Sequence, residues 1–188
     1  RSAPTRTQEA FTSVMQVFAS LHYHAWSSDI KNAFAQSRPT TRSTPIACAL
    51  PSGMREAGYP LHPEQLLKCQ TEVYGLILGP SWLRQSLVSD LEDLGYVRNY
   101  YDKCVMTLPV ESASTTGKVN DGVILIEVGD LLEGGSPRHR KLMEKFYTKY
   151  KCGKKKRLVD LKAEGTLISG IRVHQHQDFS FTWNMNEY

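Results

Sequence analysis

Apolar residues recur at every third or fourth position in several segments of the chain, and this spacing predicts amphipathic helices. In the first segment Phe11, Val14 and Met15 share one face, which should pack against a sheet. A shorter helix is expected directly after the first strand. The predicted helices cover residues 7–21, 31–36, 81–95 and 136–151.

Short apolar or alternating runs, bounded by Gly, Pro and polar clusters, predict the strands. The most hydrophobic run, VILIEV at residues 123–128, is expected at the centre of a sheet. Strands often follow one another directly and helices are few, so the pattern favours an α+β fold: an antiparallel sheet with helices packed on one face. The predicted strands cover residues 23–30, 45–50, 64–70, 104–110, 123–128, 165–175 and 179–185.

The length of 188 residues fits a single domain over residues 1–188, with residues 1–6 as a flexible lead-in. Hydrophobic residues make up 40% of the chain and charged residues 22%, which are ordinary values for a globular protein. The chain lacks an apolar run of about 18 residues, which excludes a membrane-spanning helix. Because residue 1 is Arg and not Met, we expect the chain to be part of a longer or processed protein.

The four cysteines stand far apart in the sequence and form no C-x-x-C motif, which argues against a zinc knuckle or a disulfide-stapled secreted fold. This usage predicts buried free thiols and an intracellular, reducing compartment, with nucleus, cytoplasm and organelle left open. The cysteines are Cys48, Cys69, Cys104 and Cys152.

The net charge of +4 is unevenly distributed, because residues 136–157 hold ten Lys or Arg against the single acid Glu144. The basic run at the end of this segment has three readings. It is a solvated turn, a nucleic-acid contact or a localisation signal, and a nucleic-acid contact would be steeply salt-dependent. The candidate nucleic-acid-binding residues are Lys151, Lys154, Lys155, Lys156 and Arg157.

Three blocks occur in a fixed order: SSDIKNAFAQS at residues 27–37, a long block at 66–106 that contains VYGLILGPSW, and VILIEVGDLLEGGS at 123–136. Together with the closing segment 145–188, they resemble the reverse transcriptase domain of copia-type LTR retrotransposons in a divergent, degenerate form. The resemblance covers residues 5–188. It implies a polymerase palm-like antiparallel sheet with partial fingers.

In the resemblance, Asp29 matches the first catalytic acid and Asp130 matches the second acid of an Asp-Asp pair. Both would bind Mg²⁺ in phosphoryl transfer that uses two metal ions. Gly129 stands where the first acid of the pair is expected, which implies an RNA-directed DNA polymerase fold with impaired catalysis. Glu127 shares the strand face of position 129 but lies about 7 Å away along the strand, so it is not expected to replace the lost acid. Without the resemblance, the two aspartates could be simple cap and turn residues.

The resemblance also implies a nucleotide pocket. Where the family has Lys-Gln-Ala-Pro-Arg, this chain has ILGPS at residues 77–81, which removes two cations that would face an anion. Phe34 matches a bulky residue that would block a ribose 2′-hydroxyl, although an aromatic residue there also suits a core. The residues that the resemblance places at the nucleotide are Ile30, Phe34, Tyr74, Gly75 and Pro80.

These patterns lead to a degenerate, retroelement-derived reverse-transcriptase-like domain, which would bind Mg²⁺ if it is active and no cofactor otherwise. The alternative is a noncatalytic structural subunit of a larger complex that reuses the palm fold and binds RNA, an RNA/DNA duplex or protein. An active polymerase fragment with a substitution at Gly129 is a third reading. Histidines at 22 and 24, and at 174 and 176, have metal-pair spacing, but the sequence offers no third ligand and packing or surface roles are favoured.

Overall fold

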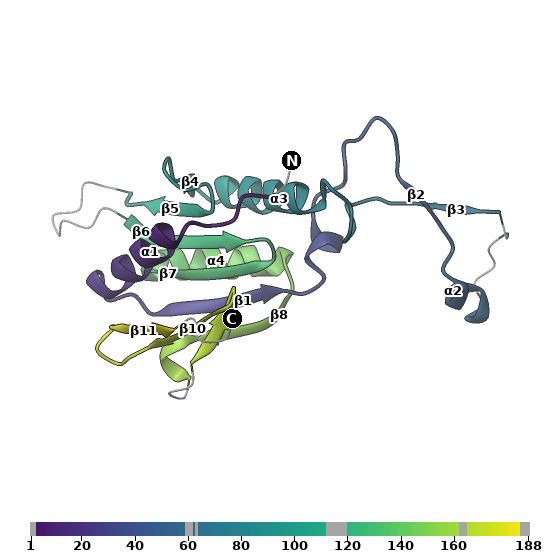
Figure 1. The fold of residues 1–188 in the computed structure, drawn as a ribbon. Helices are drawn as coiled ribbons and strands as arrows, with labels where there is room; N and C mark the ends of the chain where they lie inside the picture. Colours follow the sequence, from purple (N-terminus) through teal and green to yellow (C-terminus); the bar gives the residue numbers. More distant parts are fainter. Residues whose placement is uncertain (1–2, 59–61, 63, 112–119, 162–164, 185–188) are drawn as a thin grey trace.

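A six-stranded antiparallel sheet forms the centre of the protein in the computed structural model, which describes residues 3–58, 62, 64–111, 120–161 and 165–184 (Figure 1). The strand order is β4-β5-β6-β7-β1-β8. This arrangement confirms the predicted α+β class with antiparallel pairing. The strands are β1 (Ala25–Ile30), β4 (Val97–Arg98), β5 (Val105–Pro109), β6 (Asn120–Glu127), β7 (Asp130–Gly135) and β8 (Cys152–Arg157).

Residues 123–127 of the run VILIEV lie in β6, an interior strand, as predicted, and Val128 begins the turn after it. The apolar side chains of β6 are buried on both faces of the sheet: Val123 and Leu125 join one hydrophobic cluster, while Ile124 and Ile126 join a second. Successive side chains of a strand point to opposite faces, so a strand that is apolar throughout needs cover on both sides.

Helices provide this cover from both sides, so the prediction that they pack on one face is wrong. Helix α1 (Gln8–Ser20) contributes Phe11 and Phe18 to the first cluster. Helices α3 (Gly79–Asp93) and α4 (Pro137–Lys149) contribute to the second cluster. Figure 1 shows α1 and α4 on opposite sides of the sheet. The physical reason is the apolar run of β6, which exposes hydrophobic surface on either face.

A second, three-stranded sheet lies beside α1 and consists of β9 (Thr166–Ile168), β10 (Ile171–Gln175) and β11 (Phe181–Asn184). The sequence predicted one continuous strand over residues 165–175. The structure divides it, because Ser169 and Gly170 have positive φ angles of 47° and 81° and form a turn. The 3₁₀ helix η2 (Leu158–Asp160) connects this part to β8.

The basic run that was predicted as a turn or a nucleic-acid contact is a strand. β8 pairs with β1 and forms one edge of the main sheet. The reading as a solvated turn is therefore wrong. An edge strand tolerates consecutive lysines because such side chains can extend into solvent, and charged edges also discourage pairing with another chain.

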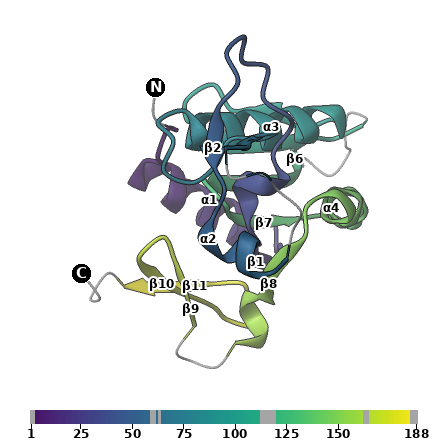
Figure 2. The same cartoon turned by 90° about the vertical axis from the view of Figure 1, so that its right-hand side faces the viewer.

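Residues 39–58, 62 and 64–73 form an arm that extends away from the main sheet (Figures 1 and 2). The arm contains β2 (Ala47–Ala49) and β3 (Leu66–Lys68), which pair only with each other among the described strands, and the short helix α2 (Ser52–Glu56). The preceding 3₁₀ helix η1 (Ala33–Gln36) leads from β1 to the arm.

The cysteines do not match the predicted set of buried thiols. Cys104 is buried, but Cys48 is exposed, and Cys69 and Cys152 are half-buried. Cys48 and Cys69 belong to the arm, and none of its described residues joins either hydrophobic cluster.

The predicted flexible lead-in is anchored in the part that the structure describes. The thiol of Cys104 lies 3.3 Å from the carbonyl oxygen of Pro4, and Arg6 Nε lies 2.9 Å from Glu127 Oε2. Thr7 then caps α1 by accepting a hydrogen bond from the backbone N–H of Ala10.

Candidate functional site

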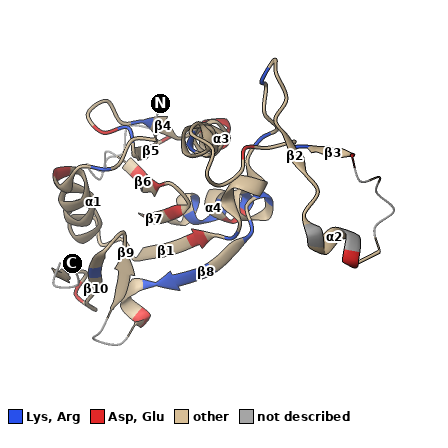
Figure 3. Cartoon of the chain, turned by 45° about the vertical axis from the view of Figure 1, so that its right-hand side comes forward, with Lys and Arg blue, Asp and Glu red and all other residues tan. Residues whose placement is uncertain are grey.

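Four charged residues lie level with one another across the main sheet. The strand register pairs Glu127 with Asp130, Asp130 with Asp29, and Asp29 with Lys154. Residues directly opposite in antiparallel strands project from the same face, so three acids and one cation form a row across β6, β7, β1 and β8. Figure 3 shows acidic segments on β1 and β7 near the basic strand β8. The sequence predicted that Asp29 and Asp130 belong to one site, and the structure places them opposite each other on neighbouring strands.

A two-residue turn, Val128-Gly129, connects β6 to β7 and presents Asp130 at the start of β7. Val128 has a φ angle of 55°, a conformation that is strained for a β-branched residue. The carbonyl oxygen of Gly129 accepts a hydrogen bond of 2.9 Å from the backbone N–H of Ile30. A Cβ at position 129 would lie 3.3 Å from the Cβ of Ala33, so a side chain there would require a small shift of η1.

A polar cavity of about 330 Å³ opens on the face that carries the two aspartates. Its wall combines two carboxylates with three cationic side chains, and residues at the start of β9 line another part of it. The lining residues are Ser27, Asp29, Asp130, Lys154, Lys156, Gly165, Thr166, Leu167 and Arg172.

Burial and the neighbouring acids disfavour the ionised form of Asp130 in this cavity. Partial burial raises the pKa of Asp130, and the charges of Asp29 and Glu127 raise it further. Repulsion between neighbouring carboxylates is relieved when a cation lies between them. Gly153 on β8 adds space, since a Cβ there would lie 3.1 Å from Oδ2 of Asp29.

Glu127 is held by a residue that the sequence did not indicate. Arg6 Nε lies 2.9 Å from Glu127 Oε2, and the side chain of Arg6 is 7% exposed. The guanidinium of Arg6 also lies 4.4 Å from the centre of the Phe11 ring. Glu127 stands opposite Asp130 in the strand register, and not beside Gly129. Its ion pair with Arg6 agrees with the expectation that Glu127 does not replace the missing acid.

The site has fewer metal-ligating side chains than a centre for two metal ions requires. Within the described parts of the chain, no group of three His, Cys, Asp or Glu residues is arranged to hold a metal ion. Asp29 and Asp130 supply two carboxylates, and Mg²⁺ in proteins commonly takes one or two carboxylates, with water and phosphate oxygens in its remaining positions. Gly129 supplies no side-chain oxygen for a second ion.

The predicted nucleotide-binding residues do not line the acidic cavity. Ile30 is buried in the core, and the Phe34 ring packs edge-on against Tyr74 with centroids 6.0 Å apart. Tyr74 is 88% exposed, Gly75 has a φ of 91°, and Pro80 lies in the first turn of α3. Ile30 directly follows Asp29, but its side chain is buried in the core and does not line the cavity, and the other four residues do not line it either.

Strand geometry divides the predicted basic cluster. Lys154 and Lys156 line the cavity, while Lys155 points to the other face of β8. There the Lys155 ammonium lies 4.0 Å from the centre of the Tyr147 ring and 5.3 Å from that of Trp26. Desolvation lowers the pKa of Lys155, so this residue has a packing role.

The two ends of the cluster do not line the cavity. Arg157 forms an ion pair with Asp160, with Nε 2.8 Å from Oδ2. The backbone N–H of Lys151 donates to the side chain of Gln36 at 2.7 Å. Of the five predicted cations, Lys154 and Lys156 are those that share the cavity with the aspartates.

The histidine pairs pack against rings. His22 and His24 flank Phe179, with centroid distances of 5.0 and 4.8 Å, and His174 lies edge-on to His176 at 4.7 Å. These contacts favour the packing reading over metal binding.

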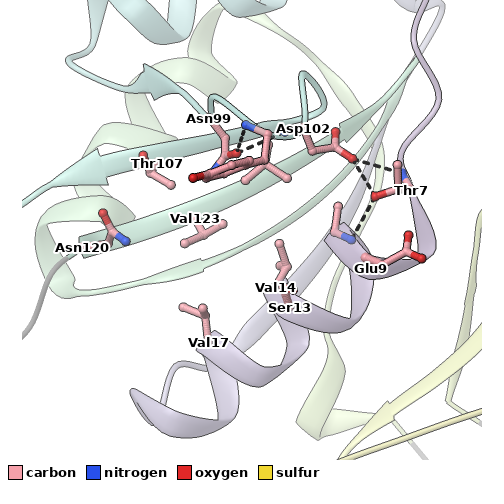
Figure 4. Close-up of a pocket in the computed structure, with 13 residues that line it drawn as sticks. Thr7, Glu9, Ser13, Val14, Val17, Asn99, Asp102, Thr107, Asn120 and Val123 are labelled. Carbon is pink, nitrogen blue, oxygen red and sulfur yellow. Dashed lines mark hydrogen bonds between the residues drawn. The ribbon is translucent and has the colours of Figure 1, made fainter.

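A second cavity of about 380 Å³ lies between α1 and strands β5 and β6 (Figure 4). Asp102 lies at its edge and accepts hydrogen bonds from Thr7 N and Oγ1 at 3.0 and 3.1 Å. Burial acts to raise the pKa of Asp102, but hydrogen bonds from Thr7 and Cys104 outweigh it and leave the pKa below its usual range. This acid fixes the start of α1, and none of the predicted site residues lines the cavity.

Comparisons of the chain with models of protein families, with curated proteins and with solved structures gave no match. Across the residues that the structure describes, no helix has the length and apolar character needed to cross a membrane.

Proposed function

We propose that the chain is a reverse-transcriptase-like palm domain, of retroelement origin, with impaired polymerase chemistry. The observation that carries this proposal is the pair Asp29 and Asp130. These residues lie opposite each other on neighbouring antiparallel strands, one at the end of β1 and the other directly after the β6–β7 turn. A palm of the copia type would bring two catalytic acids together in this way.

Polymerase catalysis is impaired in this proposal because one carboxylate is missing and another is held in an ion pair. Two-ion phosphoryl transfer requires enough oxygen ligands to activate a primer hydroxyl and to hold a triphosphate. Gly129 contributes no carboxylate, and Glu127 is neutralised by Arg6. Asp29 and Asp130 can hold one Mg²⁺, which would neutralise phosphate charge when bound.

The cationic side of the cavity suits phosphate groups. Lys154 and Lys156 project from alternate positions of the edge strand β8 into the cavity that holds the aspartates. Lysine ammonium groups attract phosphates as point charges, without fixing a base sequence. This arrangement supports a second candidate function, a noncatalytic subunit that binds an RNA or RNA/DNA backbone.

Primer extension with Mg²⁺ or Mn²⁺ tests the impaired polymerase. The unaltered protein should extend a primer much more slowly than a Gly129→Asp variant. Because a side chain at 129 approaches Ala33, the double variant Gly129→Asp/Ala33→Gly should be assayed beside the single one. Equal rates for the unaltered and restored proteins, both abolished by Asp29→Asn, would show that catalysis is intact and refute the proposal.

Filter binding to an RNA/DNA duplex at rising salt tests the second candidate. Replacing both Lys154 and Lys156 with Gln should weaken binding and lower the slope of log affinity against log salt by about 1 for each phosphate that the protein no longer neutralises. The charge-matched control is Lys141→Gln/Lys145→Gln, which changes exposed residues of α4 on the other side of the sheet. Equal effects in both variants would point to net charge alone, and the cavity would not be the binding site.

A further inference from the structure

Two cysteines on the arm face each other across a two-stranded ribbon. In the β2–β3 register Cys48 pairs with Leu67, and the N–H of Cys69 donates to the carbonyl of Ile46 at 2.8 Å. Residues two apart on a strand share a face, so the side chains of Cys48 and Cys69 project from the same face as diagonal neighbours. Their sulfur atoms lie 3.9 Å apart.

This pair is more accessible than the most deeply placed thiol of the chain. Cys48 is exposed and Cys69 is half-buried, whereas Cys104 is buried beneath Pro4. Cys152 is half-buried on β8, where its thiol faces the carbonyl of Tyr150 at 3.8 Å. A reagent in solution therefore reaches Cys48 directly and finds a second sulfur beside it.

The arm also has a structural need for a cross-link. All three residues of β2 are exposed, and an isolated pair of strands is marginally stable in water. The base of the arm is held by the ion pair between Arg42 and Glu72, where Nη2 lies 2.9 Å from Oε2. Beyond this base, the cysteine pair is a point at which a covalent bond would hold β2 to β3.

We infer that Cys48 and Cys69 form a reversible disulfide. This redox-sensitive cross-link joins β2 to β3 and fixes their register in the arm. The oxidant is a low-molecular-weight disulfide. The Cys48 thiolate attacks one of its sulfurs, forms a mixed disulfide and releases one thiolate. The Cys69 thiolate then attacks the sulfur of Cys48 and releases the second. Two cysteine thiols lose two electrons and two protons in total, and one small disulfide becomes two thiols.

Exposure assigns the order of the two steps. Cys48 is exposed and Cys69 is half-buried, so a reagent from solution meets Cys48 first and Cys69 serves as the resolving thiol. Bond formation needs the sulfurs to approach from 3.9 Å to about 2.05 Å, a movement that a thin, exposed ribbon can accommodate.

Peptide mass mapping tests the formation of this disulfide. The purified protein is first equilibrated in buffers of reduced and oxidised glutathione and then alkylated. The expected product is a peptide pair linked through Cys48 and Cys69, which is absent from Cys48→Ser and Cys69→Ser and retained in Cys152→Ser. A stable mixed disulfide on Cys48 in the unaltered protein, or linkage of either residue to Cys152, would overturn the proposal.

Limited trypsin digestion tests the effect on the arm. Lys68 is exposed and lies between the two cysteines, so cleavage after it leaves fragments joined until a reductant is added. Oxidation should slow this cleavage on the order of tenfold, because closing the loop restrains local opening of the ribbon. The Cys48→Ser protein should be cleaved equally fast in both buffers. Unchanged cleavage of the linked protein would refute the fixing of the register.

Discussion

Replacing Glu133 with Gln should lower the free energy of unfolding by about 2–4 kcal/mol, because it breaks a buried ionic network between β7 and α4. Glu133 and His139 are both fully buried, and Nε2 of His139 lies 2.7 Å from Oε2 of Glu133. Arg140 Nη1 lies 2.9 Å from Oε1, and the Tyr147 hydroxyl donates to the same oxygen at 3.4 Å. On its other side, His139 Nδ1 bonds to the hydroxyl of buried Tyr96 at 2.8 Å.

The size of this loss of stability depends on whether water can hydrogen-bond to the partners of Glu133 once its charge is removed. Removing one member of a buried ion pair usually costs about 3–5 kcal/mol. The side chain of Arg140 is 26% exposed, so water compensates it in part, while His139 has no such access. Gln keeps the shape of the side chain and one acceptor oxygen, which avoids an additional cavity cost. These corrections reduce the expected destabilisation to about 2–4 kcal/mol.

The same network gives stability a dependence on pH. Burial acts to raise the pKa of Glu133, but the hydrogen bond with His139 and the charges of Arg140 and Lys155 outweigh it and hold the pKa below its usual value of 4.5. An acid whose pKa is lower in the folded state stabilises the fold above its unfolded-state pKa. The contribution is lost as the pH falls through the folded-state pKa. The variant should therefore lose less stability on acidification than the unaltered protein.

Urea unfolding followed by circular dichroism, at neutral pH and over an acid series, measures both effects. Glu144→Gln, which changes an exposed acid on α4, is the control and should stay within about 0.5 kcal/mol of the unaltered protein. If Glu133→Gln also stays within that range, the network does not stabilise the fold and the reasoning is refuted.

Two further substitutions test other contacts. Gly122→Ala should destabilise the protein by about 2 kcal/mol or more, because its Cβ would lie 2.2 Å from Nδ1 of buried His139, and an unchanged melting temperature would contradict this packing. Arg6→Gln should release Glu127 from its ion pair and strengthen Mn²⁺ binding several-fold, because a third carboxylate then stands level with Asp130. Titration by electron paramagnetic resonance measures this affinity, and unchanged or weaker binding would show that Glu127 does not reach the ion.

Local patterns predicted the elements that form the centre of the sheet. The apolar run of β6 and the spacing of α1 depend on neighbours along the chain, so periodicity was sufficient to find them. The pairing of Asp29 with Asp130 was expected from the resemblance, and its physical basis is the antiparallel register of β1 and β7, which sets the two residues opposite each other.

Contacts between distant segments could not be predicted in this way. Arg6 meets Glu127 over a separation of 121 residues, and a short polar N-terminal segment carries no signal for such a partner. The run of lysines in β8 lacks the apolar alternation of a half-buried strand, because it forms an edge whose side chains project into a polar cavity on one face and against aromatic rings on the other. Cys48 and Cys69 approach each other only because β2 and β3 pair.

Mn²⁺ binding tests the central claim, that Asp29 and Asp130 form a carboxylate pair for a divalent cation. Electron paramagnetic resonance titration should detect one ion per chain in the unaltered protein and in the Glu144→Gln control. Either Asp29→Asn or Asp130→Asn should weaken binding by about tenfold or more, since each removes a charged ligand from a site that has few others. Binding that persists unchanged in both aspartate variants, or no binding in the unaltered protein, would contradict the claim.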